Sequence, residues 1–170
     1  MNTDLGGIMT IETPVEPEPL RHSSTTELII GAFYEVYNEL GHGFLESVYR
    51  EAMACELTSK GLRAEREKTV KVQFRNHVVG VFRTDLVVDS AVIVELKCAR
   101  NIDKMHEAQL LNYLKATDYE VGLLLNFGYR PQFRRLFMSN LQKQMREQST
   151  SLELEAVPRF AKWSGGRRCS

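Results

Sequence analysis

The chain has 170 residues, of which 43% are hydrophobic and 26% charged, and its formal net charge at pH 7 is zero. This composition fits one globular domain, and no apolar run approaches the roughly 20 residues of a membrane-spanning helix. The N-terminus lacks the pattern of a secretory signal, and the three cysteines are scattered without a Cys-x-x-Cys pair. We therefore expect a cytoplasmic protein with free thiols and no membrane partner, which excludes a disulfide-rich or Cys-ligated zinc protein.

The zero net charge conceals an uneven distribution. Residues 1–20 carry four acidic side chains and no Lys or Arg, whereas nine Lys and Arg residues but only three Glu lie from Arg130 to the C-terminus. This positive excess is compatible with a polyanionic partner near the C-terminal part, and equally with a solvated charged surface.

Composition divides the chain into three parts. Residues 1–22 hold three prolines between acidic side chains, which is typical of a disordered leader. Residues 23–148 carry the hydrophobic patterns of a folded domain. Residues 149–170 are polar and mixed, so we expect a flexible tail there.

Two helices are predicted to open the folded domain. Ser24 and Glu27 have the spacing of a capping box, so the first helix should begin there, and Gly41 should end it. A second helix should run over residues 45–60, with Gly61 as its stop. One side of the first helix should pack on the core through Ile29, Phe33, Val36, Tyr37 and Leu40.

The hydrophobic pattern then changes to the two-residue repeat of strands. Three consecutive strands are expected, with turns at Asn76–His77 and Asp89–Ser90, and the third is apolar on both faces, so it should be central in the sheet. A helix and a buried strand follow, and residues 130–148 fit either a further strand or a helix. The expected strands cover residues 70–74, 78–88, 91–97 and 121–127, and the helix covers residues 103–116.

Asp85 and the Glu95-x-Lys97 pair are the most informative residues of the sequence. If Ser90 is near the centre of a hairpin, Asp85 faces Glu95 with Cβ atoms about 5 Å apart, and Lys97 points to the same side. Two carboxylates can hold Mg²⁺ or Mn²⁺, and a lysine can orient the attacking water or offset charge on a phosphate. A one-residue slip in register would break this arrangement, and an ordinary cross-strand ion pair is the alternative.

Further polar residues could complete such a site. Gln109 and Tyr113 lie four residues apart on the predicted helix and share one face, from which they could brace the lysine or the metal ligands. Glu46 on the second helix could add a carboxylate, and His106 could touch phosphate or metal. Taken singly, each of these residues also fits an ordinary helix surface.

An ordered set of motifs over about residues 24–137 resembles a family of small bacterial proteins, named GxxExxY after its signature. The motifs are, in chain order, Gly43-x-x-Glu46-x-x-Tyr49, Asp85, Glu95-Leu96-Lys97, Gln109-x-x-x-Tyr113 and the segment 122–128. That family is grouped with the PD-(D/E)XK nuclease superfamily, and RecB-type and Cas4-type nucleases share the Gln-x-x-x-Tyr element. Thr84 departs from the superfamily motif, which often has proline before the aspartate.

The resemblance implies a restriction-endonuclease-like α/β fold, with an αβββαβ core and a mixed central sheet flanked by helices. The implied ligands of Mg²⁺ or Mn²⁺ are Asp85, Glu95 and Glu46. The implied catalytic residues are Lys97, Glu46, Gln109 and Tyr113.

We therefore hypothesise a Mg²⁺- or Mn²⁺-dependent nuclease that hydrolyses phosphodiester bonds, with DNA as the expected substrate, in a repair or defence context. Arg100, His106 and Arg130 are the candidate nucleic-acid contacts. Two alternatives stay open. One is an inactive nucleic-acid- or protein-binding module on the same fold, and the other is an accessory subunit that acts with a larger protein partner.

Overall fold

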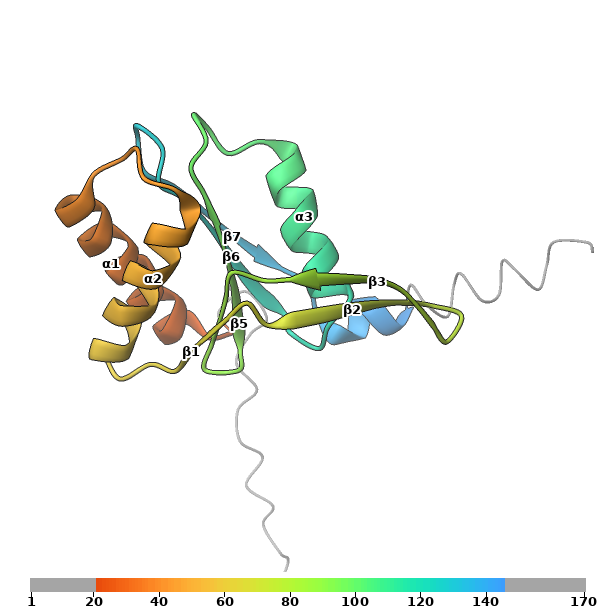
Figure 1. The fold of residues 1–170 in the computed structure, drawn as a ribbon. Helices are drawn as coiled ribbons and strands as arrows, with labels where there is room; N and C mark the ends of the chain where they lie inside the picture. Colours follow the sequence, from red (N-terminus) through yellow and green to blue (C-terminus); the bar gives the residue numbers. More distant parts are fainter. Residues whose placement is uncertain (1–20, 146–170) are drawn as a thin grey trace, which may run out of the picture.

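The computed structural model describes residues 21–145, and its helices and strands form a layered α/β arrangement (Figure 1). The elements are α1 (Ser23–Leu40), α2 (Glu46–Ser59), β1 (Ala64–Arg66), β2 (Thr69–Phe74), β3 (His77–Arg83), β4 (Leu86–Val88), β5 (Val92–Lys97), α3 (Lys104–Lys115), β6 (Val121–Asn126) and β7 (Gln132–Phe137). The predicted tail, and the predicted leader except for its last two residues, lie outside the described part of the chain.

The main sheet has five strands in the order β1-β4-β5-β6-β7. Only β5 and β6 are parallel, and every other neighbouring pair is antiparallel, so the sheet is mixed. The parallel pair needs a long connection, which α3 supplies. The predicted α/β fold with a mixed central sheet flanked by helices is confirmed, and the ambiguous segment after residue 130 forms the edge strand β7.

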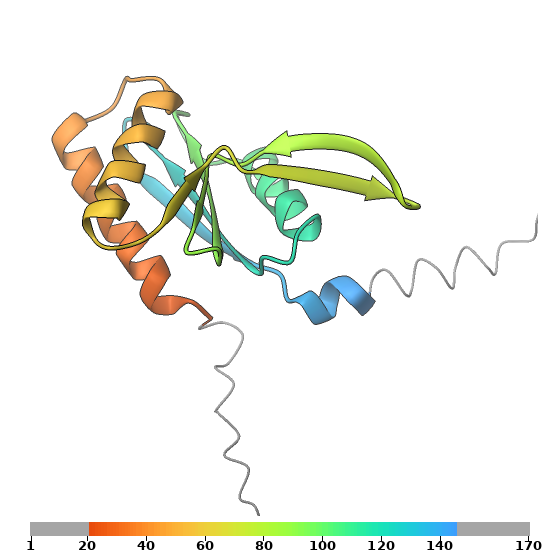
Figure 2. The same cartoon turned by 60° about the horizontal axis from the view of Figure 1, so that its bottom comes forward.

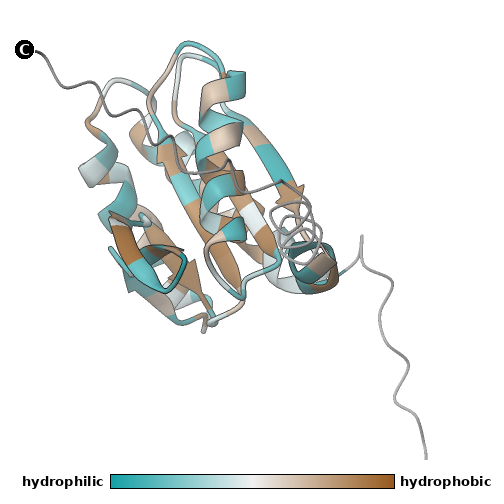
Figure 3. Ribbon diagram, turned by 90° about the vertical axis from the view of Figure 1, so that its right-hand side faces the viewer, coloured by the Kyte–Doolittle hydropathy of each residue, from teal (hydrophilic) through white to brown (hydrophobic). Residues whose placement is uncertain are grey.

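Helices cover both faces of this sheet (Figure 1). Alternate side chains of β5 point to opposite faces, so Val92, Val94 and Leu96 pack with α1 and α2, whereas Ile93 packs against α3. The buried central strands are the brown bands of Figure 3. The same alternation sends Glu95 and Lys97 to the α3 face, where the apolar packing ends.

A two-stranded ribbon, β2 with β3, leaves the main sheet and projects past α3 (Figure 2). The prediction of one strand over residues 78–88 is wrong, because the chain bends after β3 and only then enters the sheet as β4. Glu67 takes a left-handed φ of 49° opposite this bend, and its N–H donates to the Asp85 carbonyl. Such irregularities in a β ladder bend a strand and change the direction of a side chain.

The helix ends follow the sequence in part. Gly41 stops α1 with a φ of 70°, as expected, but the predicted capping box at Ser24 does not form. α1 begins at Ser23 without a side-chain cap, and the Thr26 hydroxyl donates to the Ser23 carbonyl instead. Within residues 21–145, no helix combines the length and the apolar character that crossing a membrane requires.

The segment after β6 braces the end of β5. The buried Asn126 side chain accepts a hydrogen bond from the Ala99 N–H and donates one to the Ala99 carbonyl, each at 2.9 Å. The Phe127 N–H donates to the Lys97 carbonyl at 2.7 Å. A Cβ on Gly128 would lie 2.0 Å from the Ala99 carbonyl oxygen, so this position requires glycine. These contacts fix the backbone directly after Lys97.

We expect Gly128→Ala to destabilise the protein, because the added methyl must push the Ala99 backbone away. The free energy of unfolding should fall by about 1–3 kcal/mol, the usual range for overpacking. Gly31→Ala is the matched control, since nothing lies within 4 Å of its Cβ in α1, and alanine there should add up to about 1 kcal/mol. Urea unfolding followed by circular dichroism measures both changes, and equal stabilities of the two variants would contradict the packing described here.

Candidate active site

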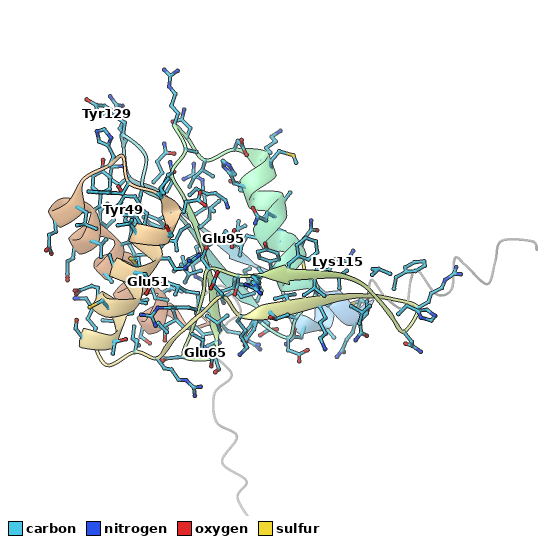
Figure 4. The ribbon with its side chains drawn as sticks, in the orientation of Figure 1. Tyr49, Glu51, Glu65, Glu95, Lys115 and Tyr129 are labelled. Atoms are coloured by element: carbon cyan, nitrogen blue, oxygen red, sulfur yellow. The ribbon has the colours of Figure 1, made fainter. Side chains whose placement is uncertain are left out.

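Asp85, Glu95 and Lys97 converge at the junction of β4 and β5. The two strands pair with Leu86 opposite Val94 and Val88 opposite Val92, and the register continued by one residue sets Asp85 opposite Glu95. The paired residues Val88 and Val92 enclose the loop Asp89-Ser90-Ala91, so Ser90 lies at the centre of the hairpin, and Asp89 and Ser90 both have a positive φ. The register predicted from the sequence is therefore confirmed. Figure 4 shows Glu95 between α2 and α3, at the root of the ribbon.

Glu95 is a buried carboxylate with one oxygen engaged and one oxygen free. The residue is only 4% exposed. Its Oε1 accepts hydrogen bonds from Lys97 Nζ at 3.0 Å and from Gln109 Nε2 at 2.7 Å, whereas Oε2 is buried and has no partner among the described residues. Burial, followed by repulsion from Asp85, raises the pKa of Glu95 to about 7, although Lys97 opposes the shift.

The Asp85 carboxylate is held by a backbone N–H group and by the guanidinium group of Arg50. Its Oδ2 accepts the Leu96 N–H at 2.8 Å, and Oδ1 accepts from Arg50 Nη1 at 3.4 Å. Thr84 just before it donates its N–H to the Lys68 carbonyl, a bond that a proline could not make. Arg50 is a site residue without a motif of its own, and the available signal is that it lies four residues after Glu46 and so shares a face of α2 with it.

Lys97 is a half-buried cation among carboxylates. Burial works to lower the pKa of its ammonium group, but Glu95, Glu46 and Asp85 outweigh burial and raise that pKa above its ordinary value. The charge of Glu46 also helps raise the pKa of the neighbouring Cys98 thiol. Glu46 itself is exposed at the first residue of α2. Glu46 therefore exerts an electrostatic effect on both Lys97 and Cys98, at the end of β5.

Gln109 and Tyr113 join the site from α3. Gln109 Nε2 donates both to Glu95 Oε1 and to the Tyr113 hydroxyl, the latter at 2.9 Å. Burial raises the pKa of Tyr113, which stays a neutral phenol. The predicted shared face of α3 therefore points at Glu95, and Gln109 donates to the same carboxylate oxygen as Lys97 does.

Tyr49 explains why the motif around Glu46 has its spacing. Its buried ring stacks on Phe127, with ring centres 4.1 Å apart. Its hydroxyl donates to the Gly41 carbonyl at 2.9 Å and accepts from the Phe44 N–H at 3.3 Å. Gly43 between them takes a φ of 109°, which favours glycine. Tyr49 thus holds in place the loop between α1 and α2, and this loop positions Glu46 at the start of α2.

The three candidate nucleic-acid contacts lie outside this cluster. Asp103 caps α3, and the His106 Nδ1 accepts the Asp103 N–H at 3.3 Å in return, so the imidazole has a structural task. Arg100 and Arg130 are exposed on the loops that follow β5 and β6. These loops lie side by side, because Asn126 joins them through Ala99. The assignment of all three residues to nucleic-acid binding stays a prediction.

The sequence comparison identifies the family. Residues 23–136 match the family model described as the PD-(D/E)XK nuclease superfamily. The chain belongs to this superfamily. No curated protein matches the sequence.

Two solved structures share some of its layout. SSO0001 is 19% identical, with 84% of this chain and 73% of that chain covered and a TM-score of 0.42. The alkaline exonuclease LHK-Exo from Laribacter hongkongensis is 11% identical, with 79% of this chain and 81% of that chain covered and a TM-score of 0.43.

The donors at the site fit a divalent cation. Oε2 of Glu95 is buried without a partner, and Asp85 repels the same carboxylate, so a cation between them would satisfy both. Carboxylate oxygens are the donors that Mg²⁺ and Mn²⁺ prefer. Among residues 21–145, no three His, Cys, Asp or Glu side chains gather as a ready-made metal cage. Glu46 as a third ligand therefore stays a prediction.

We expect metal-free protein to lose stability as the pH rises from about 4.5 to 7. The folded state raises the pKa of Glu95 from 4.5 to about 7, so it binds the proton more tightly than the unfolded chain does. The contribution of this pKa shift to the free energy of unfolding is of the order of 3 kcal/mol. It is fully present below pH 4.5 and is lost as the pH rises through 7. Urea unfolding in a chelating buffer from pH 4.5 to 8 measures this fall.

Glu95→Gln is the matched variant, because its neutral amide lacks the proton linkage. Its stability relative to the wild type should increase with pH over the same range. Adding Mn²⁺ at pH 8 should then stabilise the wild type and leave Glu95→Gln unchanged. Parallel pH curves for the two proteins would show that Glu95 is not buried as described.

Proposed function

We propose that this protein is a Mg²⁺- or Mn²⁺-dependent nuclease that hydrolyses phosphodiester bonds in DNA. The observation that carries the proposal is the buried Glu95, which Asp85 repels: one of its oxygens is held by Lys97 and Gln109, and the other has no partner within residues 21–145. Buried carboxylates are costly unless paired, so this arrangement suits a site that receives a cation. Membership of the PD-(D/E)XK nuclease superfamily supports the same conclusion.

In this proposal Asp85 and Glu95 hold the cation, with Glu46 as a further carboxylate. The bound cation supplies positive charge to the phosphate and increases the acidity of a coordinated water. Asp85 is oriented for its task by the Leu96 N–H. Lys97 remains an ammonium group and stabilises the negative charge that develops on the phosphate oxygens.

The remaining predicted residues support these groups. Gln109 and Tyr113 keep Glu95 in one orientation and exclude water from its engaged oxygen. Arg100, Arg130 and His106 are proposed to contact the DNA backbone. The Gly43-x-x-Glu46-x-x-Tyr49 and Gln109-x-x-x-Tyr113 motifs favour the GxxExxY family and a RecB-like or Cas4-like arrangement within the superfamily.

The cellular setting follows from weaker signals. Cys55 and Cys98 are free and exposed, which suits the reducing cytoplasm. We assign the enzyme to DNA repair or defence, where it acts together with a larger protein partner.

Removing the lysine should abolish catalysis while leaving the fold intact. Purified wild type, Lys97→Ala and Asp85→Asn are incubated with labelled single-stranded and double-stranded DNA, and with RNA, in Mg²⁺ or Mn²⁺. We expect both variants to cleave about 10²- to 10⁴-fold more slowly than the wild type, because each loses a group that acts on the reacting phosphate. A chelator should stop wild-type cleavage.

Lys60→Ala is the control for loss of a lysine. Lys60 lies at the end of α2, where it pairs with Glu35 and Glu56 on the protein surface. Its removal should leave the cleavage rate within about twofold of the wild type, because exposed ion pairs contribute little to stability. Cleavage that persists unchanged in Lys97→Ala, or nucleic-acid binding without any cleavage in the wild type, would reject the nuclease assignment.

A further inference from the structure

A groove of about 920 Å³ separates the β2–β3 ribbon from α3 and reaches the proposed catalytic residues. Gln109 and Tyr113 line it at the end nearest Glu95, and residues after α3 line it at the other end. Figure 4 shows Lys115 where α3 passes the ribbon. Polar and aromatic side chains line its length, among them Lys71, Gln73, Phe82, Asn112 and Lys115.

We propose that this groove binds one strand of DNA and leads it to Glu95 and Lys97. The inference deepens the proposed nuclease function and rests on it. It assigns substrate binding to the ribbon and α3, in addition to the loop residues Arg100 and Arg130.

The charges of the groove suit a phosphate backbone. Lys71 and Lys115 are exposed on opposite walls, and neither forms an ion pair within residues 21–145. Asp118 is the one acidic side chain on the lining of the groove as described here. Lys143 also borders the groove, but its ammonium group already donates to the Thr117 and Tyr119 carbonyls. Two available cations and several amides can therefore follow a short run of phosphates.

An exposed aromatic ring gives the groove a surface for a base. Phe82 on β3 is 48% exposed although it lies on the groove lining. Its ring centre is 6.0 Å from that of Tyr113, which belongs to the proposed site. Bases stack on such rings without regard to sequence, which is the usual mode of single-strand binding.

The dimensions of the groove fit a short single strand. From Gln109 to Lys115 the axis of α3 advances about 9 Å, which spans roughly three stacked nucleotides. The groove volume of about 920 Å³ has room for a few nucleotides.

The groove leads directly to the proposed catalytic residues. Gln109 Nε2, on the groove lining, donates to Glu95 Oε1 at 2.7 Å. A DNA strand that lies along α3 is therefore separated only by the Gln109 side chain from the Glu95 carboxylate, which is proposed to hold the cation. Because the hairpin root also carries Asp85, the same bend in the chain forms both the groove wall and the metal site.

Binding is measured in a chelating buffer, so that cleavage plays no part. The probe is a fluorescein-labelled ten-residue oligothymidine, followed by anisotropy with the full chain, and a blunt duplex of equal length is the comparison. Lys71→Ala/Lys115→Ala should weaken single-strand binding about tenfold or more and reduce the slope of log K against log salt by about 1.4, the value for two phosphate contacts. Phe82→Ala should weaken it about 5- to 100-fold, as expected for one stacked base.

Lys60→Ala, which removes a lysine far from the groove, should bind like the wild type. The groove proposal is overturned if the wild type binds and cleaves DNA while the double lysine variant keeps its affinity and its salt slope. It is also overturned if duplex binds more tightly than single strand, or if Phe82→Ala dissociates a dimer without changing DNA affinity, which would assign the groove to a second copy of the chain. Groove-dependent binding by a wild type that never cleaves in Mg²⁺ or Mn²⁺ would instead reject the nuclease function alone.

Discussion

The buried carboxylate of Glu95 is the constraint on which the site depends. A carboxylate in the interior is unfavourable unless partners replace the water it has lost. The chain supplies those partners to one oxygen only, through Lys97 and Gln109, and the second oxygen has no partner within residues 21–145. Asp85 repels this carboxylate, although Lys97 and Arg50 each pair with one of the two carboxylates. Such an arrangement is useful to a protein that binds cations and costly to one that does not.

Much of this arrangement is local, and local features could be predicted from the sequence. The hairpin of β4 and β5 is centred on Ser90, so counting residues outward from Ser90 was enough to set Asp85 opposite Glu95. The four-residue spacing of Gln109 and Tyr113 likewise gave a shared helix face. Strand β5 was expected to be central because it is apolar on both faces, and it lies third of five strands.

The features that escaped prediction depend on contacts between distant segments. The bend between β3 and β4 requires the left-handed Glu67, which lies 18 residues before Asp85 and has no marked sequence signal. The link between Asn126 and Ala99 joins two loops that only the parallel pairing of β5 and β6 brings together. The expected cap at Ser24 failed because capping motifs state a local preference, and the start of a helix also depends on its tertiary packing.

The bent β2–β3 ribbon extends away from the candidate active site. Strands β2 and β3 are joined to the same two backbone segments that present Asp85, but the turn between them projects away from the main sheet (Figure 1). Pairs of residues could be gained or lost at that tip during evolution without shifting a carboxylate. A fold of this kind can acquire new substrate preferences through changes in the length of the β2–β3 ribbon, while the arrangement of its active-site residues stays the same.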